Sequence, residues 1–211
     1  MRRVALALVM ILAMTAGLAL AAGPSADAIL ASLKKGFAGI NDYRADVCLT
    51  VKGPSVSINN MRMTVYFKKP NRVHVDADQG MAMVPKGSFL GNPMADLANG
   101  ARPVYVRSER KLGRDCHVLK LVKPDKPAMT LWVDREHTVL VAAESPDMGI
   151  KSAWCYEKID GGYYLPVEIR ADMRSPGGPS SGRTVKAVLK FSNYRVNKGI
   201  SDKVFDEKPR K

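Results

Sequence analysis

The chain has 211 residues and a formal net charge of +13, with 46% hydrophobic and 7% aromatic residues. A chain of this length can bury a core of its own and fits a single domain. The basic excess indicates an anionic partner, such as a membrane surface, an acidic lipid head group or an acidic protein, unless it serves solubility alone. The few aromatic residues do not alternate with basic ones, which argues against a base-stacking nucleic-acid surface.

Residues 1–21 predict a signal peptide. Two arginines precede an apolar run that ends in the A-x-A pattern of residues 19–21. We therefore expect a periplasmic mature chain of residues 22–211, folded as one domain. The run is long for a signal peptide, so an uncleaved membrane anchor is the alternative. No cysteine precedes Cys48, so no lipid is expected on the mature N-terminus.

The first predicted element after this segment is a helix. Either Ser25 or Asp27 can cap its N-terminus. Its apolar side chains recur at helical spacing, at Ile29, Leu33, Phe37 and Ile40. One stripe of this kind predicts a helix that covers an apolar surface.

Beyond the helix the sequence pattern changes to strict alternation. Residues 43–52, 56–68 and 72–78 predict three antiparallel strands with one apolar face and one polar face. The apolar positions include Val47, Leu49, Met61, Met63, Val65, Phe67, Val73 and Val75. A change of parity within the second segment predicts a β-bulge near Asn59 and Asn60.

The remaining chain predicts seven more strands. They span residues 104–107, 116–122, 129–134, 138–144, 151–159, 163–173 and 184–196. Short turn sequences rich in Pro, Gly and Asp separate most of them, which indicates a meander of about ten strands. Because twist accumulates and long open edges invite aggregation, such a sheet must curl strongly. The predicted fold class is mainly β, with a minor helical part.

Residues 80–100 depart from the alternation. They are apolar but interrupted by proline and glycine, and a short helix is expected over 93–97. Their large apolar side chains are Met81, Met83, Phe89, Leu90, Met94 and Leu97. Flexible methionine side chains suit either ordinary core filling or an interior that repacks around guests of varied shape.

No catalytic or cofactor motif is present. His74, His117 and His137 do not have metal-ligand spacing, and no phosphate-binding glycine loop follows a strand. Carboxylates such as Asp134 and Asp160 lie in predicted turns, where they usually cap the local backbone. We expect a protein without enzymatic activity, metal or cofactor.

The three cysteines allow at most one disulfide. Cys48, Cys116 and Cys155 each lie within a predicted strand, where a lone cysteine usually behaves as a small hydrophobic residue.

Several segments resemble the LolA/LolB-like family of periplasmic outer-membrane lipoprotein carriers and sorting proteins. The resemblance follows the N-terminal helix and the stretches INDYRADVCLTV, MTVYFKKPNRVHVD, LWVDREHTVLVAAE, GGYYLPVEIRADM and FSNYRVNKGISDKVFDEK. It implies an unclosed antiparallel half-barrel whose concave apolar face, covered by helices, holds lipoprotein acyl chains. The cavity lining would then consist of the eight apolar positions of the first three strands together with Leu165, Val167 and Ile169. The lid would comprise Ile29, Leu33 and Phe37 together with the six apolar residues of the segment 80–100.

Two positions depart from the family pattern. In the family, an arginine precedes the proline of the first hairpin, and this arginine latches the lid. This chain has Lys69 at that position. An ammonium group lacks the planar fork of a guanidinium, so the latch is weaker or is moved to Arg72. The family's Ser-Asp-Gly-aromatic strand pair is also replaced by residues 80–100.

The resemblance implies a monomeric carrier that binds lipoprotein acyl chains or lipid and delivers them to the outer membrane. Its partners would be an inner-membrane release complex and an outer-membrane acceptor, with transient membrane contact and no nucleic acid. The alternative is an envelope-stress sensor or interaction module that uses the same scaffold to bind a partner protein.

Overall fold

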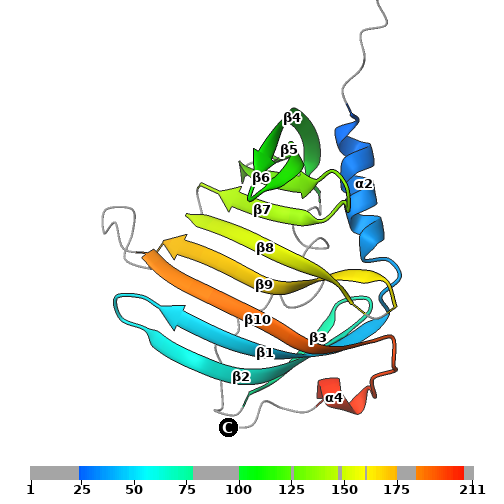
Figure 1. The fold of residues 1–211 in the computed structure, drawn as a ribbon, viewed down its shortest axis with the longest axis vertical. Coiled ribbons are helices and arrows are strands. Elements are labelled where there is room, and N and C mark those ends of the chain that lie inside the picture. Colours follow the sequence, from blue (N-terminus) through cyan, green and yellow to red (C-terminus); the bar gives the residue numbers. More distant parts are fainter. Residues whose placement is uncertain are drawn as a thin grey trace, which may run out of the picture.

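The computed structural model describes residues 24–77, 100–124, 126–146, 149–159, 161–174 and 184–206. They form one ten-stranded antiparallel sheet and two helices (Figure 1). The strand order is β3-β2-β1-β10-β9-β8-β7-β6-β5-β4. Within each half of this order, neighbouring strands follow one another in the chain, as the meander predicted. Only the β1–β10 pair joins distant segments. The edges of the curved sheet are β3 and β4, so the half-barrel is not closed.

The elements have the following bounds: α2 (Ala26–Gly36), β1 (Asp42–Lys52), β2 (Ser57–Lys68), β3 (Arg72–Ala77), β4 (Arg102–Lys111), β5 (Arg114–Lys123), β6 (Lys126–Asp134), β7 (Leu140–Ser145), β8 (Ile150–Ile159), β9 (Tyr163–Arg174), β10 (Thr184–Val196) and α4 (Lys203–Asp206).

The predicted bulge in β2 is confirmed. Leu49 pairs with Met61 while Val51 pairs with Ile58, so β2 has one more residue than β1 across this interval. Asn60 has a positive φ of 51°, and its backbone N–H donates to Thr50 Oγ1 at 3.4 Å. The bulge restores the apolar face of β2 to the side on which the apolar face of β1 lies.

The predicted strand 104–107 was too short. The hairpin of β4 and β5 turns at Leu112 and Gly113, whose φ angles are 50° and 80°. Two adjacent positive φ angles produce a tight two-residue turn that lets both strands continue to it. The end of β4 could not be recognised from the sequence. The residues before this turn are polar on both faces of the strand, so they show no apolar alternation.

The sheet carries a hydrophobic cluster on each face. The larger cluster includes Ile29, Leu30 and Leu33 of α2, which places it on the face that the helix covers. The second lies on the opposite face of β5, β6 and β7, and consists of Cys116, Val118, Trp132, Val141 and Ala142. No helix among the described residues is long and apolar enough to cross a membrane.

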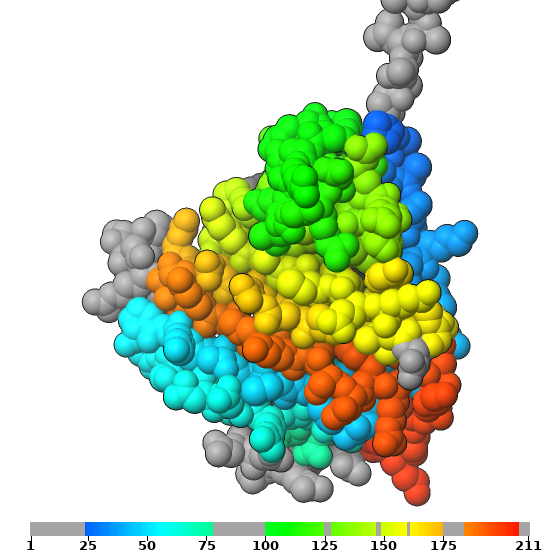
Figure 2. Space-filling model, viewed as in Figure 1, coloured from blue at the N-terminus to red at the C-terminus, as the bar shows by residue number. Residues whose placement is uncertain are grey.

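The outer face of β1, β10, β9 and β8 forms the front surface of the molecule in the view of Figure 2. In the same orientation, α2 lies beside this surface and α4 below it, and neither crosses these four strands (Figure 1). The described helices therefore leave this side of the sheet uncovered.

Candidate functional site

The candidate site is the apolar space between α2 and the sheet. Ser25 caps the helix, since its Oγ accepts the Ala28 N–H at 3.3 Å. The apolar stripe predicted from the sequence turns Ile29 and Leu33 inward, with Leu30 between them, while Lys34 and Lys35 remain exposed. The helix thus covers the sheet with one face, as its periodicity predicted.

The helix spans the opening between the two halves of the sheet. Beyond its C-terminal end, Phe37 packs edge-on against Phe67 of β2, with ring centroids 6.4 Å apart. The helix also packs against β4, the strand at the other edge of the sheet. The helix and the residue after it therefore contact β4 at one edge of the sheet and β2 beside the other edge.

Three anchors hold the junction between α2 and β1. Lys69 of the β2–β3 turn donates from Nζ to the Ala38 carbonyl and, at 3.3 Å, to Asn41 Oδ1. Tyr163 of β9 donates its hydroxyl to the Gly39 carbonyl at 3.2 Å. Asn197, just after β10, completes the set. The C-terminal end of the helix is thereby tied to three separate parts of the sheet.

Asn197 forms hydrogen bonds on both sides of this junction. Its Nδ2 donates to the Gly39 carbonyl at 2.8 Å, and its Oδ1 accepts the Asn41 N–H at 2.7 Å. The residue has a φ of 54°, a left-handed conformation that asparagine tolerates better than most residues. This gives a physical role to Asn197 in the stretch FSNYRVNKGISDKVFDEK.

The residues after Asn197 attach the C-terminal segment to the β2–β3 hairpin. Lys68 binds Asp202 at 2.9 Å and Arg72 binds it at 2.6 Å, while the Arg72 guanidinium lies 4.7 Å from the Phe205 ring. The hydrogen bond from Lys68 is the main reason why the pKa of Asp202 lies below its usual value. Arg72 therefore holds α4, and Lys69 holds the α2 junction.

Most predicted lining residues lie together in the larger cluster. Those that are buried in it are Val47, Leu49, Met63, Val65, Phe67, Leu165 and Ile169. Met61 and Val75 are half-buried against it.

Two predicted lining residues differ from this set. Val73 pairs with Phe67, yet it is 43% exposed because β3 is an edge strand. Val167 is left unpaired by a bulge, since Cys155 pairs with Glu168 while Tyr156 pairs with Pro166, and it is only half-buried outside the cluster. Strict alternation in β9 predicted Val167 as a lining residue without the bulge, which redirects the side chains beside it.

A small pocket of about 180 Å³ opens at the C-terminal end of α2. Leu33 and Phe37 face the β6–β7 turn and the β8–β9 hairpin across it, where His137 packs on Tyr164 with ring centroids 4.5 Å apart. Ligand pockets usually occupy roughly 300–1,000 Å³. This pocket is therefore smaller than a usual ligand pocket.

Asp134 shapes the turn that carries His137. Its carboxylate accepts the His137 N–H at 2.7 Å and the Glu136 N–H at 2.9 Å, and it lies 3.1 Å from Arg114. Burial opposes the charged form, but these hydrogen bonds and the guanidinium outweigh it and lower the pKa of Asp134. The capping role predicted for this residue is confirmed.

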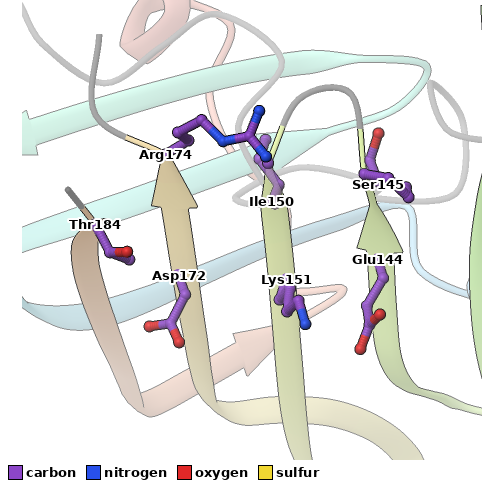
Figure 3. A pocket seen from close by; sticks show the side chains of 9 residues that line it. Glu144, Ser145, Ile150, Lys151, Asp172, Arg174 and Thr184 are labelled. Carbon is purple, nitrogen blue, oxygen red and sulfur yellow. The ribbon is translucent and has the colours of Figure 1, made fainter. Parts of the chain in front are cut away.

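A larger pocket of about 590 Å³ lies elsewhere, at the ends of β7 to β10. Figure 3 shows Glu144, Lys151 and Asp172 side by side on three neighbouring strands, with Arg174 reaching toward Ile150. Charged side chains on three of its strands make this pocket a poorer place to bury an alkyl chain than the apolar cluster under α2. The candidate site for an apolar ligand remains the space under α2.

Comparison with solved structures identifies the architecture. A LolA superfamily protein from Nitrosomonas europaea superposes with a TM-score of 0.60 at 18% identity, over 87% of this chain and 98% of its own. A DUF1329 family protein from Desulfovibrio piger gives 0.57 at 15% identity, over 85% and 96% of the two chains. An outer-membrane lipoprotein-sorting domain from Vibrio parahaemolyticus gives 0.57 at 14% identity, over 86% and 97%.

The chain has a LolA-like fold. No protein-family model matches it, and no curated protein matches it either. At these low sequence identities, the similarity to the solved structures shows a shared fold alone.

The helical part of the predicted lid of this LolA-like fold lies where the sequence placed it. Ile29 and Leu33 are buried and Phe37 is half-buried against the sheet. Met81, Met83, Phe89, Leu90, Met94 and Leu97 lie outside the described residues, as do the signal segment 1–21 and the short helix expected over 93–97.

Aromatic side chains that were not among the predicted lining residues form another part of the LolA-like interior. Tyr43 stacks on Phe67 with centroids 5.3 Å apart, and Tyr194 lies 5.8 Å from Tyr43 and 6.1 Å from Phe191. Burial raises the pKa of Tyr43, and it is also the main cause of the raised pKa of Tyr194, so both phenols stay neutral.

A second bulge explains the omission. Between Ser192 and Arg195, β10 contains one residue more than β1, and Asn193 there has a φ of 52°. Phe191 and Tyr194 consequently face the same interior although simple alternation places them on opposite faces. Asn193 was the available signal, because asparagine is enriched at positive φ.

The three cysteines are free. Cys116 is buried, as expected of a small hydrophobic residue, but Cys155 is exposed and Cys48 half-buried. Cys48 pairs with Lys190, Lys190 with Glu168, and Glu168 with Cys155, so three strand spacings of about 4.8 Å separate these two thiols. That separation is too large for a disulfide without movement of the backbone.

Proposed function

We propose that this protein is a non-enzymatic periplasmic carrier that holds the acyl chains of a lipoprotein, or of a lipid, between α2 and the sheet. It receives them at the inner membrane and releases them to an acceptor at the outer membrane. It acts as a monomer and contacts membranes transiently.

The observation that carries the proposal is the way in which α2 is attached. Its apolar face covers the large cluster, while the hydrogen bonds that anchor it are concentrated at residues 38–41, at the junction with β1. A cover held at one end can swing about that end without breaking the sheet. The helix is therefore suited to act as a hinged lid.

The free energy of burial favours such an exchange. Each buried methylene contributes about 0.8 kcal/mol, so a sixteen-carbon chain gains on the order of 12 kcal/mol when it leaves water. The helix buries Ile29, Leu30 and Leu33 in the same place. The protein's own side chains can thus occupy the site when the cargo is absent, which keeps a large apolar patch out of water.

The pocket at the end of α2 supports a mechanism of displacement. Its volume of about 180 Å³ is smaller than that of a usual ligand pocket, so we infer that a long acyl chain displaces the helix. Loading and release then become a competition between α2 and the acyl chain for one apolar surface. Displacement of the chain by the returning helix would drive release.

The test is a transfer assay. Spheroplasts that display a radiolabelled lipoprotein are incubated with the purified protein, and label is followed into the soluble fraction and then onto outer-membrane vesicles. A carrier releases the label in soluble form and delivers it. Failure to release any label, together with binding to the periplasmic segment of an inner-membrane protein, would instead establish a sensor on the same scaffold.

A further inference from the structure

The uncovered outer face of the sheet carries a basic stripe. It consists of six side chains on β1, β2 and β10: Arg44, Lys52, Arg62, Lys186, Lys190 and Arg195. All except Arg44 are exposed. The β1 and β10 strands that carry most of the stripe lie on the face shown in Figure 2.

The register of the strands arranges these charges regularly. Arg44 pairs directly with Arg195, and Lys52 pairs directly with Lys186. Midway between them, Cys48 has Arg62 on one side and Lys190 on the other. Eight residues separate the two end pairs, so the stripe is about 27 Å long and, over three strands, about 10 Å wide.

These charges are poorly compensated within the protein. Arg44 binds Asp46 at 3.0 Å. For the other five, no carboxylate of the described part of the chain lies within ion-pair distance. On the β9 side, the register places Asp172 opposite Lys186 and Glu168 opposite Lys190, so carboxylates border the stripe there. Between β1 and β10, like charges lie directly opposite each other in the Lys52–Lys186 and Arg44–Arg195 pairs, an arrangement that destabilises a sheet and that an external anion would relieve.

We propose that the basic stripe docks the protein on an anionic phospholipid surface. Lysine and arginine near such a surface are each attracted by the negative potential of the head groups, and six of them act together. Exposed charges act over about one Debye length, roughly 8 Å at physiological salt, so each basic side chain of the stripe attracts the head groups that it approaches directly.

The character of the face favours a membrane over a protein partner. Protein interfaces depend on aromatic or aliphatic anchors that enter pockets. The residues between the basic positions on β1 and β10 are Asp46, Cys48, Thr50, Val188 and Ser192, and none of them is an exposed large apolar side chain. A second copy of this chain is excluded as the partner, because two basic stripes repel each other.

This docking surface is separate from the lipid site. The stripe lies on the face opposite the cluster under α2, so a docked protein keeps its lid free. Docking can therefore be measured whether or not the protein carries lipid, and its failure would leave the carrier proposal untouched.

The experiment is vesicle co-sedimentation of the full protein. The probes are phosphatidylcholine vesicles with and without phosphatidylglycerol. The test variant is Lys52→Gln/Arg62→Gln/Lys186→Gln/Lys190→Gln. The matched control, Arg102→Gln/Lys120→Gln/Lys158→Gln/Lys203→Gln, removes the same number of charges from exposed positions outside the stripe. Circular dichroism establishes that both variants are folded.

The wild type and the control variant are expected to bind only the anionic vesicles, and the stripe variant at least about tenfold more weakly. Salt that shortens the Debye length to about 3 Å should release the protein. The proposal is overturned if neutral vesicles bind equally well, if both variants lose binding to the same extent, or if the wild type ignores anionic vesicles. Binding of polyglutamate but not of vesicles would assign the stripe to an acidic protein instead.

Discussion

Phe67 is the residue at which the sheet, the helix and the aromatic cluster meet. It is almost completely buried, contacts the rings of Phe37 and Tyr43, and pairs with Val73 across the β2–β3 hairpin. Any cargo that replaces α2 on the apolar face must contact this ring or lie beside it.

We predict that Phe67→Asp abolishes lipid co-purification, measured by mass spectrometry of extracted lipids. A carboxylate in this position cannot be buried against an acyl chain without a cost of several kcal/mol. Tyr66→Asp, one residue away on the opposite face, should retain its lipid. If Phe67→Asp does not fold, Val75→Asp on the neighbouring strand replaces it. Normal lipid loading of a folded interior variant would show that the cavity lies elsewhere.

A second prediction at this scale concerns the stability cost of the basic stripe. Lys52 lies opposite Lys186 on one neighbouring strand and opposite the uncharged Ser57 on the other. Lys52→Gln should therefore raise the free energy of unfolding by about 0.5 kcal/mol, although it removes a charged surface residue. Urea denaturation at low salt measures the change, and high salt should abolish it. Lys120→Gln serves as the control, and a loss of stability in Lys52→Gln would refute the explanation.

Among the described elements, α2 is tied to the sheet by side-chain hydrogen bonds at its junction with β1. Lys69 contributes two of the contacts at the junction with β1. These contacts set the direction in which the helix leaves the junction, and that direction is the one of the closed form, in which the helix occupies the apolar face. Whatever weakens them shifts the competition toward cargo.

Lys69→Leu is accordingly predicted to release cargo more slowly, by about fivefold, which is the effect of losing one net hydrogen bond of about 1 kcal/mol. The measurement is the rate of transfer of a fluorescent lipid to acceptor vesicles. Lys120→Leu removes an exposed lysine elsewhere and should leave the rate unchanged. An unaltered rate in Lys69→Leu would place the lid's control outside this turn.

The attachment of α4 should depend on pH. The pKa of Asp202 is lowered from its usual value of 3.8, chiefly by the hydrogen bond from Lys68. A depressed pKa means that the carboxylate stabilises the folded form above pH 3.8 and that this contribution is lost as the pH falls through the lowered value. We expect the NMR signals of the Phe205 ring to shift toward solvent-exposed values only in strong acid. Asp202→Asn should show this exposed state already at neutral pH.

At the level of the whole molecule, periodicity was enough to predict the strands. The apolar alternation of β1, β2 and β3 and the turns between the later strands determine a curled antiparallel meander, and the helical stripe of α2 determines its cover. The bulge at Asn59 and Asn60 was also predictable, because a change of parity within one strand has no other simple explanation.

What could not be predicted depends on contacts between distant segments. The junction of α2 is held by Tyr163 and Asn197, which lie far along the chain from Gly39. The interior position of Tyr194 depends on a bulge whose register is set by the neighbouring strand. Hydrogen bonds between distant segments and register shifts produce no local periodicity in the sequence from which they could be predicted.

Native mass spectrometry of the protein isolated from the periplasm tests the central claim most directly. The account predicts that the wild type carries an acyl-bearing adduct, and that the folded Phe67→Asp variant is free of it. A wild-type protein without any adduct, or an adduct that persists unchanged in Phe67→Asp, would contradict the assignment of the space under α2 as the cargo site.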